Sequence, residues 1–251
     1  MNNTLILFDV DKTLSESRCK MTMDMRNLLV VLKNKGYTIG IVGGSDFEKQ
    51  KEQLGEDIRD FFEYTFSENG LVAYHWNQPI LYHSSIEYPQ LTIQKFLGDV
   101  FLTEFIDYVL EALSKIKLPF KRGVFIEMRN GMINICPCGR SVTSEERKMF
   151  EVFDHEHHIR KTLVNILALK FGKTLKFSIG GTISIDAFPH GWDKTFCLQF
   201  VQHLYKDIHF FGDQTQQGGN DYEIYRDARV IGHQVKNPED TMNQIKTLFF
   251  S

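Results

Sequence analysis

The chain has 251 residues, of which 42% are hydrophobic and 24% are charged, and its net charge is −3. This composition is typical of a globular protein, and the small negative charge gives no electrostatic reason to expect nucleic acid or an anionic membrane as a partner. No apolar stretch approaches the ~20 residues that a membrane-spanning helix needs. The start, Met-Asn-Asn-Thr, lacks the basic and apolar parts of a signal peptide, so we expect a cytoplasmic protein.

Four scattered cysteines are too few for a disulfide scaffold, and we expect free thiols in a reducing compartment. Cys136 and Cys138 flank a proline and lack the C-x-x-C spacing of a metal site, so they are predicted to be strand residues.

The first 40 residues predict a strand, a helix and a second strand. The apolar run at residues 5–8 suits a strand that is covered on both faces. Thr22 is expected to cap a helix through Met25 and Leu32, which Gly36 ends. Residues 37–42 then form a second buried strand.

The pattern continues to about residue 80. The Gly43-Gly44-Ser45-Asp46 segment leads into a helix through Leu54, and Glu68-Asn69-Gly70 is a turn signal between two strands of a short hairpin. This β-α-β-α order predicts a doubly wound, Rossmann-like parallel sheet with helices on both faces.

The sequence changes character between residues 86 and 187. The expected elements there are a long helix over about 90–116, strands over 123–129 and 131–136, a helical stretch from Ser144 to about Phe171 that breaks near His155, and strands over 174–179 and 182–188. Helix, hairpin, helix, hairpin is typical of an antiparallel α+β layer rather than of more parallel sheet.

The α/β pattern resumes at Asp193. We expect a helix to Tyr205, a strand over 208–212, a short strand near Val230 and a final helix from Pro238. The predicted fold class is therefore α/β, with a discontinuous core (residues 1–85 and 188–251) and an inserted α+β cap (residues 86–187).

Two acidic residues follow the first strand. Asp9 lies at its carboxyl end, where open α/β sheets place their ligand sites, and Asp11 is two residues further on. In an extended chain the two side chains point to the same side. One carboxylate as nucleophile and a second as proton shuttle are the parts that covalent phosphoryl transfer needs. Taken alone, the pair is equally compatible with a solvated loop.

Two segments offer positive charge and hydrogen-bond donors near predicted helix starts. Ser45 follows two glycines, which allow close backbone approach to an anion, although it also suits a plain helix cap. Lys194 lies in the first turn of a helix, where the helix dipole disfavours a cation, so a nearby carboxylate or phosphate would explain its position. An ordinary surface lysine is the alternative.

A third carboxylate repeats the Asp9 arrangement. Asp213 ends the apolar strand over 208–212, and Gly218-Gly219-Asn220-Asp221 follows. Carboxylates that converge at neighbouring strand ends suit Mg²⁺, which prefers hard oxygen ligands and keeps few protein ligands. The ion would reduce repulsion between Asp9 and an incoming phosphate.

The inserted region is rich in arginine, and guanidinium groups bind phosphate through two parallel hydrogen bonds. The candidates for gripping an anionic substrate are Arg122, Arg129, Arg140 and Arg147, with Ser184 and Asp186 further on. Each arginine alone is equally well explained as a solvated surface charge. The histidine cluster over residues 154–158 resembles a metal site in composition, but a polar helix break explains it as well.

Together these segments resemble the haloacid dehalogenase superfamily of phosphoryl-transfer enzymes. The resemblance is closer still to eukaryotic-type phosphomannomutase and covers nearly the whole chain. It rests on Val-Gly-Gly-Ser-Asp-Phe-Glu-Lys at 42–49, Ser-Glu-Asn-Gly-Leu-Val-Ala-Tyr at 67–74, Arg-Asn-Gly-Met at 129–132, Ser-Glu-Glu-Arg at 144–147, Phe-Ser-Ile-Gly-Gly at 177–181 and Gly-Trp-Asp-Lys at 191–194.

The resemblance implies an isomerase that interconverts mannose 6-phosphate and mannose 1-phosphate and is primed by a hexose 1,6-bisphosphate. It further implies hexose phosphates as ligands, Mg²⁺ as cofactor, a homodimer through the cap, and a cytosolic role in GDP-mannose synthesis. A sugar-phosphate phosphatase of the same superfamily is the alternative enzyme, and an inactive scaffold is the non-enzymatic alternative.

The same resemblance assigns roles to residues. Asp9 becomes the phosphorylated nucleophile and Asp11 the general acid and base, while Ser45 and Lys194 steady the phosphoryl group. Mg²⁺ would be held by Asp9, the Asp11 main chain and Asp213, with Asn220 and Asp221 in the next layer. Substrate would be bound by Arg18, Arg129, Arg140, Arg147, Ser184 and Asp186, and a second cation by Asp227 and the Tyr225 carbonyl.

Three positions depart from the family pattern. Lys12 stands where the family usually has glycine, and Gln214 stands where it usually has lysine. Val230 replaces a hydroxyl residue that is expected near the second cation site.

Overall fold

The computed structural model describes residues 3–80 and 92–250. The chain forms two compact units, one of Met1–Pro89 with Gly191–Ser251 and the other of Gln90–His190. The first unit is therefore assembled from two separate stretches of the chain. The domain boundary predicted at residues 85 and 86 lies outside the described residues.

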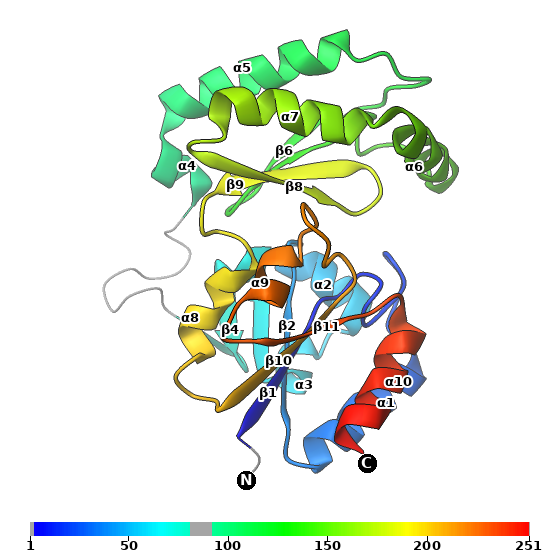
Figure 1. Cartoon of the computed structure of the whole chain (residues 1–251), viewed down its shortest axis with the longest axis vertical. Helices are drawn as coiled ribbons and strands as arrows, with labels where there is room; N and C mark the ends of the chain where they lie inside the picture. The colour runs from blue at the N-terminus through cyan, green and yellow to red at the C-terminus, as the bar shows by residue number, and fades with distance from the viewer. Residues whose placement is uncertain (1–2, 81–91, 251) are drawn as a thin grey trace. The chain divides into compact units, whose positions relative to one another are not determined.

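The first unit contains a seven-stranded sheet in the order β11-β10-β1-β2-β3-β4-β5 (Figure 1). All pairs from β11 to β3 are parallel, and β4 and β5 are antiparallel at one edge. The strands are β1 (Thr4–Phe8), β2 (Thr38–Val42), β3 (Tyr64–Ser67), β4 (Val72–His75), β5 (Gln78–Pro79), β10 (Asp207–Gly212) and β11 (Ile231–Gln234). The predicted parallel sheet and the hairpin around residues 68–70 are confirmed.

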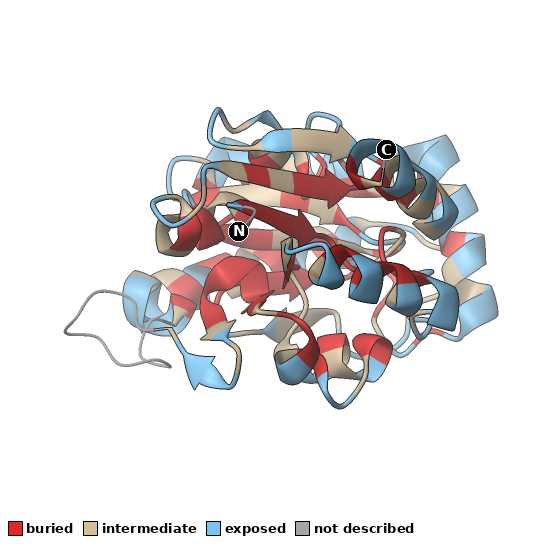
Figure 2. Ribbon diagram, turned by 90° about the horizontal axis from the view of Figure 1, so that it is seen from below, coloured by how far each residue is buried: buried red, intermediate tan, exposed pale blue. Residues whose placement is uncertain are grey.

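Helices cover both faces of this sheet. Every residue of β1 is therefore buried, although its side chains alternate between the two faces. Ile6 and Phe8 pack on the side of α1 (Met23–Asn34), α2 (Phe47–Leu54), α3 (Ile58–Phe61) and α10 (Pro238–Phe249). Leu5 and Leu7 pack on the side of η2 (Lys194–Cys197), α8 (Leu198–Val201) and α9 (Tyr222–Arg226). In Figure 2 the buried residues gather on the strands and on the faces of the helices that meet them.

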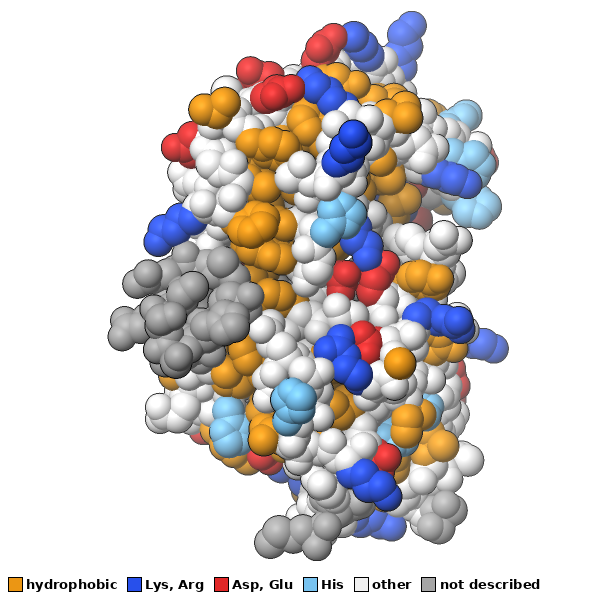
Figure 3. Space-filling view, turned by 60° about the vertical axis from the view of Figure 1, so that its left-hand side comes forward, with side chains coloured by type: hydrophobic (Ala, Val, Ile, Leu, Met, Phe, Trp, Pro, Cys, Tyr) orange, Lys and Arg blue, Asp and Glu red, His pale blue; other side chains and the backbone are white. Residues whose placement is uncertain are grey.

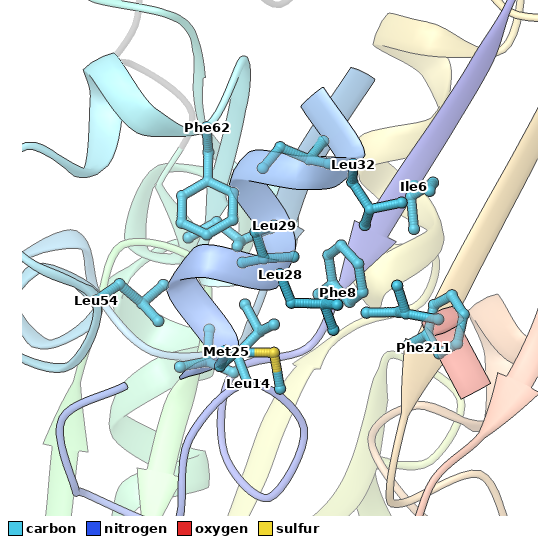
Figure 4. Close-up of a cluster of buried hydrophobic side chains, with 14 of the residues drawn as sticks. Ile6, Phe8, Leu14, Met25, Leu28, Leu29, Leu32, Leu54, Phe62 and Phe211 are labelled. Carbon is cyan, nitrogen blue, oxygen red and sulfur yellow. The ribbon is translucent and has the colours of Figure 1, made fainter. Parts of the chain in front are cut away.

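Helix α1 follows the sequence pattern closely. Thr22 accepts a hydrogen bond from the Met25 N–H and so caps the helix, as predicted. The apolar residues spaced along its inner face pack against Phe8 and Phe211, as Figure 4 shows. Gly36, at φ 86°, follows the helix, as the sequence indicates.

The second unit is an antiparallel layer covered by helices. Its sheet runs β6-β7-β9-β8, and all of its pairs are antiparallel. The elements are α4 (Ile93–Leu97), α5 (Asp99–Lys115), β6 (Ile126–Met128), β7 (Ile133–Ile135), α6 (Ser144–His157), α7 (Ile159–Phe171), β8 (Leu175–Gly180) and β9 (Ser184–Pro189). The α+β character expected for this stretch is confirmed.

The single long helix predicted over 90–116 is wrong. Its described part forms α4 and α5, which are separated at Gly98. Gly98 has a φ of 76°, a conformation that a side chain disfavours and that cannot continue a right-handed helix. The break predicted near His155 falls at His158, whose φ is 53°.

Two further predictions need correction. The helix expected from Asp193 to Tyr205 is only the 3₁₀ turn η2 followed by the short α8, which ends at Val201. Cys136 and Cys138 are not strand residues, because β7 ends at Ile135 and both cysteines lie in the buried turn that follows. The four cysteines are free thiols, as expected.

Candidate active site

The site begins at the carboxyl ends of two adjacent parallel strands. Residues Phe8 and Phe211 are paired in register, so the residues that follow β1 and β10 emerge side by side. The Asp9 N–H donates to the Phe211 carbonyl at 2.9 Å, which extends the ladder by one step and fixes the Asp9 backbone. Asp9 and Asp213 therefore converge because of sheet geometry.

One lysine holds two of the carboxylates together. The Lys194 Nζ atom lies 2.5 Å from Asp9 Oδ1 and 2.5 Å from Asp221 Oδ1. Lys194 and Asp221 are fully buried, and Asp9 is nearly so. The Asp193 side chain accepts from the Thr195 N–H and starts η2, so the turn places Lys194 in its first position. A buried cation between two carboxylates explains why lysine occupies this position.

Burial and the neighbouring charges act in opposite directions on these groups. Burial raises the pKa of Asp9 well above its usual value, although the Lys194 ammonium opposes the shift. Burial alone would lower the pKa of Lys194, but Asp221 and Asp9 outweigh it and the pKa is raised. Lys194 therefore stays charged, and an additional positive charge at the site would favour the ionised form of Asp9.

A third carboxylate completes an acidic cluster. Carboxylate oxygens of Asp9, Asp213 and Asp221 all lie within 4.8 Å of one another. The Gln214 backbone N–H donates to Asp221 Oδ2 at 3.0 Å, and its side-chain amide donates to Asp213 Oδ2 at 2.7 Å. Gly212 is required here, since a Cβ on it would lie 2.6 Å from Asp221 Oδ2.

Hard oxygen ligands in this arrangement fit Mg²⁺. Asn220, the residue before Asp221, adds a buried Oδ1 atom that has no hydrogen-bond partner among the described residues. An unpaired buried carbonyl oxygen in the residue next to Asp221 is consistent with a ligand that the protein itself does not supply. In residues 3–80 and 92–250, this is the one group of three or more acidic, histidine or cysteine side chains that suits a metal.

Asp11 is oriented separately from the cluster. Its Oδ1 atom accepts from the Gln53 side chain at 2.8 Å and from the Arg18 N–H at 3.1 Å. No hydrogen bond within the described part of the chain uses Asp11 Oδ2. A carboxylate that is held by one oxygen and open at the other suits proton transfer. Arg18 itself is exposed in the same loop.

The Gly43-Gly44-Ser45-Asp46 segment lies at the end of β2. A Cβ on Gly43 would lie 3.9 Å from Asp9 Oδ1, so this loop approaches Asp9 closely. Asp46, not Ser45, caps α2 by accepting from the Lys49 N–H. The Ser45 hydroxyl instead accepts from the Lys49 ammonium at 3.0 Å, which leaves its own O–H available as a donor.

The predicted substrate residues of the second unit form a polar row across its sheet. Glu127, Asn134 and Asp186 are paired in register on neighbouring strands. The Asn134 amide donates to Asp186 Oδ1 at 2.6 Å and its carbonyl oxygen accepts from Arg140 at 2.5 Å. Glu127 accepts from Arg129 at 2.7 Å and pairs with Arg140 at 3.2 Å.

Two more predicted residues border this row. An Arg147 guanidinium N–H donates to the Arg140 carbonyl at 3.0 Å, and the Ser184 hydroxyl donates to the Gly180 carbonyl at 3.3 Å. A Cβ on Gly180 would lie 3.0 Å from Asp186 Oδ2, so the row is closely packed.

At two other candidate sites, an acidic residue forms an ion pair within the protein. Both Asp227 oxygens bind Arg229, at 2.7 Å each, and the carboxylate–guanidinium contact lowers the pKa of Asp227. Asp227, one of the two residues predicted to hold a second cation, is thus paired with Arg229, and the site at Tyr225 and Asp227 stays a prediction. In the histidine cluster, Asp154 pairs with the buried Arg160 at 2.7 Å, and α6 ends three residues later at His157.

The sequence analysis missed two residues that organise these sites and placed a third, Asp221, outside the acidic cluster. Asp221 is a member of the acidic cluster rather than an outer residue, and Gln53 holds Asp11 from the end of α2. Glu127 joins two of the arginines. Only Glu127 carries a local signal, because it precedes Arg129 by two residues and so lies on the same side of a strand.

Comparison with known proteins identifies the family. Residues 25–251 match the family described as eukaryotic phosphomannomutase. The chain is 50% identical to a phosphomannomutase of Galdieria sulphuraria over 248 residues, which cover 98% of this chain and 95% of that protein. The corresponding values for the Saccharomyces cerevisiae phosphomannomutase are 49% over 248 residues, 98% and 94%. The chain belongs to the eukaryotic phosphomannomutase family.

Solved structures with little sequence similarity share the fold. The N-terminally truncated IMP-nucleotidase of Plasmodium falciparum has a TM-score of 0.65 at 17% identity, covering 99% of this chain and 70% of that one. The sucrose-phosphatase of Synechocystis has a TM-score of 0.53 at 14% identity, with 98% of each chain covered. These similarities support the fold described above, an α/β unit with an inserted α+β unit. Within the described residues, no helix combines the length and apolarity needed to cross a membrane.

Proposed function

We propose that the chain interconverts mannose 6-phosphate and mannose 1-phosphate through a phosphoryl group carried on Asp9. The observation that carries the proposal is the buried Asp9 carboxylate at a strand end, paired with Lys194 inside an acidic cluster. The membership of the chain in the eukaryotic phosphomannomutase family, and the names of its relatives, support mannose phosphates as the substrates.

In the proposed reaction an Asp9 oxygen attacks phosphorus, a new acyl phosphate bond forms and the phosphate ester bond to the sugar breaks. Asp11 gives a proton to the departing sugar oxygen and takes it back when the next hydroxyl attacks, through its open Oδ2 atom. Lys194 stays charged and lies beside Asp9, so it counters the negative charge that gathers on the phosphoryl group. Ser45 contributes a hydroxyl donor.

The acidic cluster would hold Mg²⁺ through Asp9, Asp213 and the Asp11 main chain, with Asp221 and Asn220 beside them. When bound, the ion supplies positive charge to the phosphoryl oxygens and favours the ionised nucleophile. The fit rests on the oxygen-only donor set and on the unpaired Asn220 oxygen.

The polar row of the second unit would bind the sugar and its other phosphate. A mutase must keep a bisphosphate bound by one phosphate while the other reacts, which requires a second anion site. Arg129, Arg140 and Arg147 supply guanidinium groups of the type that binds phosphate bidentately, and Arg18 adds another in the first unit. A hexose 1,6-bisphosphate would prime the enzyme by phosphorylating Asp9.

We further propose a homodimer that forms through the second unit. Hydrophobic side chains gather on the face of this unit that Figure 3 shows. Exposed apolar residues on its helices include Phe96 and Val100, as well as Leu169, which is 88% exposed. Contiguous apolar surface of this kind is typical of subunit interfaces. The proposed setting is the cytosol, where mannose 1-phosphate supplies GDP-mannose synthesis.

The test is an assay of mannose 1-phosphate conversion with and without added hexose 1,6-bisphosphate. The proposal expects mannose 6-phosphate as product and little turnover without the bisphosphate. Release of inorganic phosphate as the main product, independent of the bisphosphate, would instead identify a sugar-phosphate phosphatase. No turnover of either kind would favour a scaffold.

A further inference from the structure

Three consecutive residues after β3 have a left-handed backbone. Glu68, Asn69 and Gly70 form the turn η1 (Glu68–Gly70), and their φ angles are 47°, 63° and 102°. Glycine adopts this conformation readily, whereas a Cβ disfavours it, although asparagine tolerates it better than most residues. Backbone of this kind persists only where the surrounding structure fixes it, and it is frequent at functional sites.

The turn η1 holds the loop that carries Ser45. The Asn69 N–H donates to the Gly43 carbonyl at 2.9 Å, and the Glu68 N–H donates to the Ser45 carbonyl at 3.0 Å. The Gly43 N–H donates to the Phe66 carbonyl at 3.0 Å, which continues the pairing of β2 with β3. These three bonds fix the backbone of the Ser45 loop from the side of β3.

The Asn69 side chain binds the turn that carries Lys194. Its Nδ2 atom donates to the Trp192 carbonyl at 3.1 Å, and Asn69 is only 5% exposed. The next residue, Gly70, packs directly on η2, since a Cβ on it would lie 2.9 Å from the Cα of Cys197. The Cys197 thiol donates to the Lys194 carbonyl at 3.1 Å. Asn69 therefore connects the two loops, the first through its backbone and the second through its side chain.

We propose that Asn69 is a positioning residue that fixes Ser45 and Lys194 relative to each other, so that both contact the phosphoryl group at Asp9. Asn69 acts through these two side chains. The inference rests on the proposed function, because it takes Ser45 and Lys194 to be the groups that stabilise the transferring phosphoryl group.

The physical basis is that both groups must reach one phosphoryl group at the same time. Such donors stabilise a transition state only when they are already in place, and a displacement of about 1 Å can lower a rate about a hundredfold. Loss of the Asn69 side-chain bond allows η2 to move relative to the Ser45 loop. The rate at saturation therefore falls, whereas ground-state binding of the ester changes little.

The experiment measures hydrolysis of p-nitrophenyl phosphate by the full chain with Mg²⁺ present, because this reaction needs only the groups around Asp9. N69G removes the side-chain donor and leaves a residue that accepts a positive φ. N69D keeps the size of the side chain, but a carboxylate cannot donate to the Trp192 carbonyl. For both variants we expect kcat to fall about tenfold to thirtyfold and KM to change less than about threefold.

The matched control is N77G, which makes the same change at the other end of β4. Asn77 is exposed, and its Nδ2 atom donates to Asp60 Oδ1 at 2.5 Å. Its loss should leave both kcat and KM unchanged.

A second readout would not respond to lost stability alone. S45A is measured in the wild-type and in the N69G background. If Asn69 aligns Ser45 with Lys194, Ser45 contributes less once the Asn69 side chain is gone. We therefore expect S45A to lower kcat about tenfold in the wild-type background and less than about threefold in N69G.

Unchanged kcat in folded N69G and N69D would overturn the inference, and circular dichroism establishes that each variant is folded. If N69G does not fold, N69D decides. An S45A effect of equal size in both backgrounds would also overturn it, as would a fall in kcat of N77G as large as that of N69G. A wild-type protein that hydrolyses the ester but does not interconvert mannose phosphates would reject the proposed mutase activity alone, whereas one that does neither would reject both.

Discussion

The two units organise charge in different ways. In the first unit, three carboxylates cluster together and two of them pair with a fully buried lysine. In the second unit, arginines lie along a polar row in which Glu127 and Asn134 accept their hydrogen bonds. A buried charge cluster shifts pKa values and suits chemistry, whereas half-buried guanidinium groups keep their charge and suit binding. This difference is consistent with the proposed roles, a reacting centre in the first unit and a substrate-binding surface in the second.

The largest effect should follow removal of the buried cation. K194A leaves Asp9 and Asp221 buried without their shared partner, and we expect the free energy of unfolding to fall by about 3–5 kcal/mol at pH 7. Urea unfolding followed by circular dichroism measures it. K170A in the second unit removes a partly exposed pair with Glu104 and should cost less than about 1 kcal/mol. Equal losses in the two variants would remove the contrast between a buried and a solvated charge.

Replacement of an arginine of the polar row should lower mutase turnover much more than hydrolysis of a simple phosphate ester. R140A is expected to lower mutase turnover about 100-fold, because the second phosphate loses a bidentate partner. Hydrolysis of p-nitrophenyl phosphate needs only the reacting centre and should change less than about threefold. K115A, which removes an exposed lysine of the second unit that pairs with Glu111, is the control and should keep both activities. Equal losses of both activities in R140A would contradict the proposal that Arg140 binds the second phosphate and takes no part in the reaction at Asp9.

A partly buried histidine pair makes the stability of the first unit depend on pH. Burial, with His209 adding to it, lowers the pKa of His233 to about 4, and the two rings lie 2.8 Å apart between nitrogens. Because the unfolded pKa is near 6.5, the folded state resists protonation, so stability is full above about pH 6.5 and falls toward pH 4. After allowance for partial exposure, the loss is about 1–2 kcal/mol.

The variant H233F should flatten this profile when thermal unfolding is followed between pH 7 and pH 4. H75Q changes an exposed histidine on β4 and serves as the control that keeps the wild-type slope. A wild-type profile with no fall in this interval would show that the pair does not titrate as described.

The smallest effects compare helix caps in the two units. Thr22 caps α1 in the first unit, and Thr143 forms a capping box with Glu146 at the start of α6 in the second. T22A and T143A should each cost about 1 kcal/mol. Differential scanning calorimetry will show whether the two changes move the same transition. A null result for either variant would mean that its cap contributes nothing to the unfolding equilibrium.

Much of the reacting centre could be predicted from the sequence. Asp9 and Asp213 each end an apolar run, and parallel strands place such ends together, so their convergence needs only sheet topology. The position of Lys194 in a first helical turn, where the helix dipole disfavours a cation, indicates a nearby carboxylate or phosphate. Its two partners were not specified, because Asp221 lies 27 residues further along the chain and Asp9 belongs to the other stretch of the first unit.

Other features depend on interactions that no local pattern encodes. The amphipathic spacing predicts one continuous helix, but the chain breaks it at Gly98. Asp227 forms an ion pair with Arg229, two residues further on. Cys136 and Cys138 are buried in the turn after β7, although the sequence predicts them to be strand residues. The polar row was found only in part, since its centre, Asn134, has no distinguishing neighbour in the sequence.

The claim on which the account depends is that an Asp9 oxygen attacks phosphorus. The most direct measurement is the rate at which D9N converts mannose 1-phosphate in the presence of hexose 1,6-bisphosphate. The account predicts a fall of at least about a thousandfold in a protein that remains folded, since an amide cannot form the acyl phosphate. A D9N protein that turns over at the wild-type rate would contradict it.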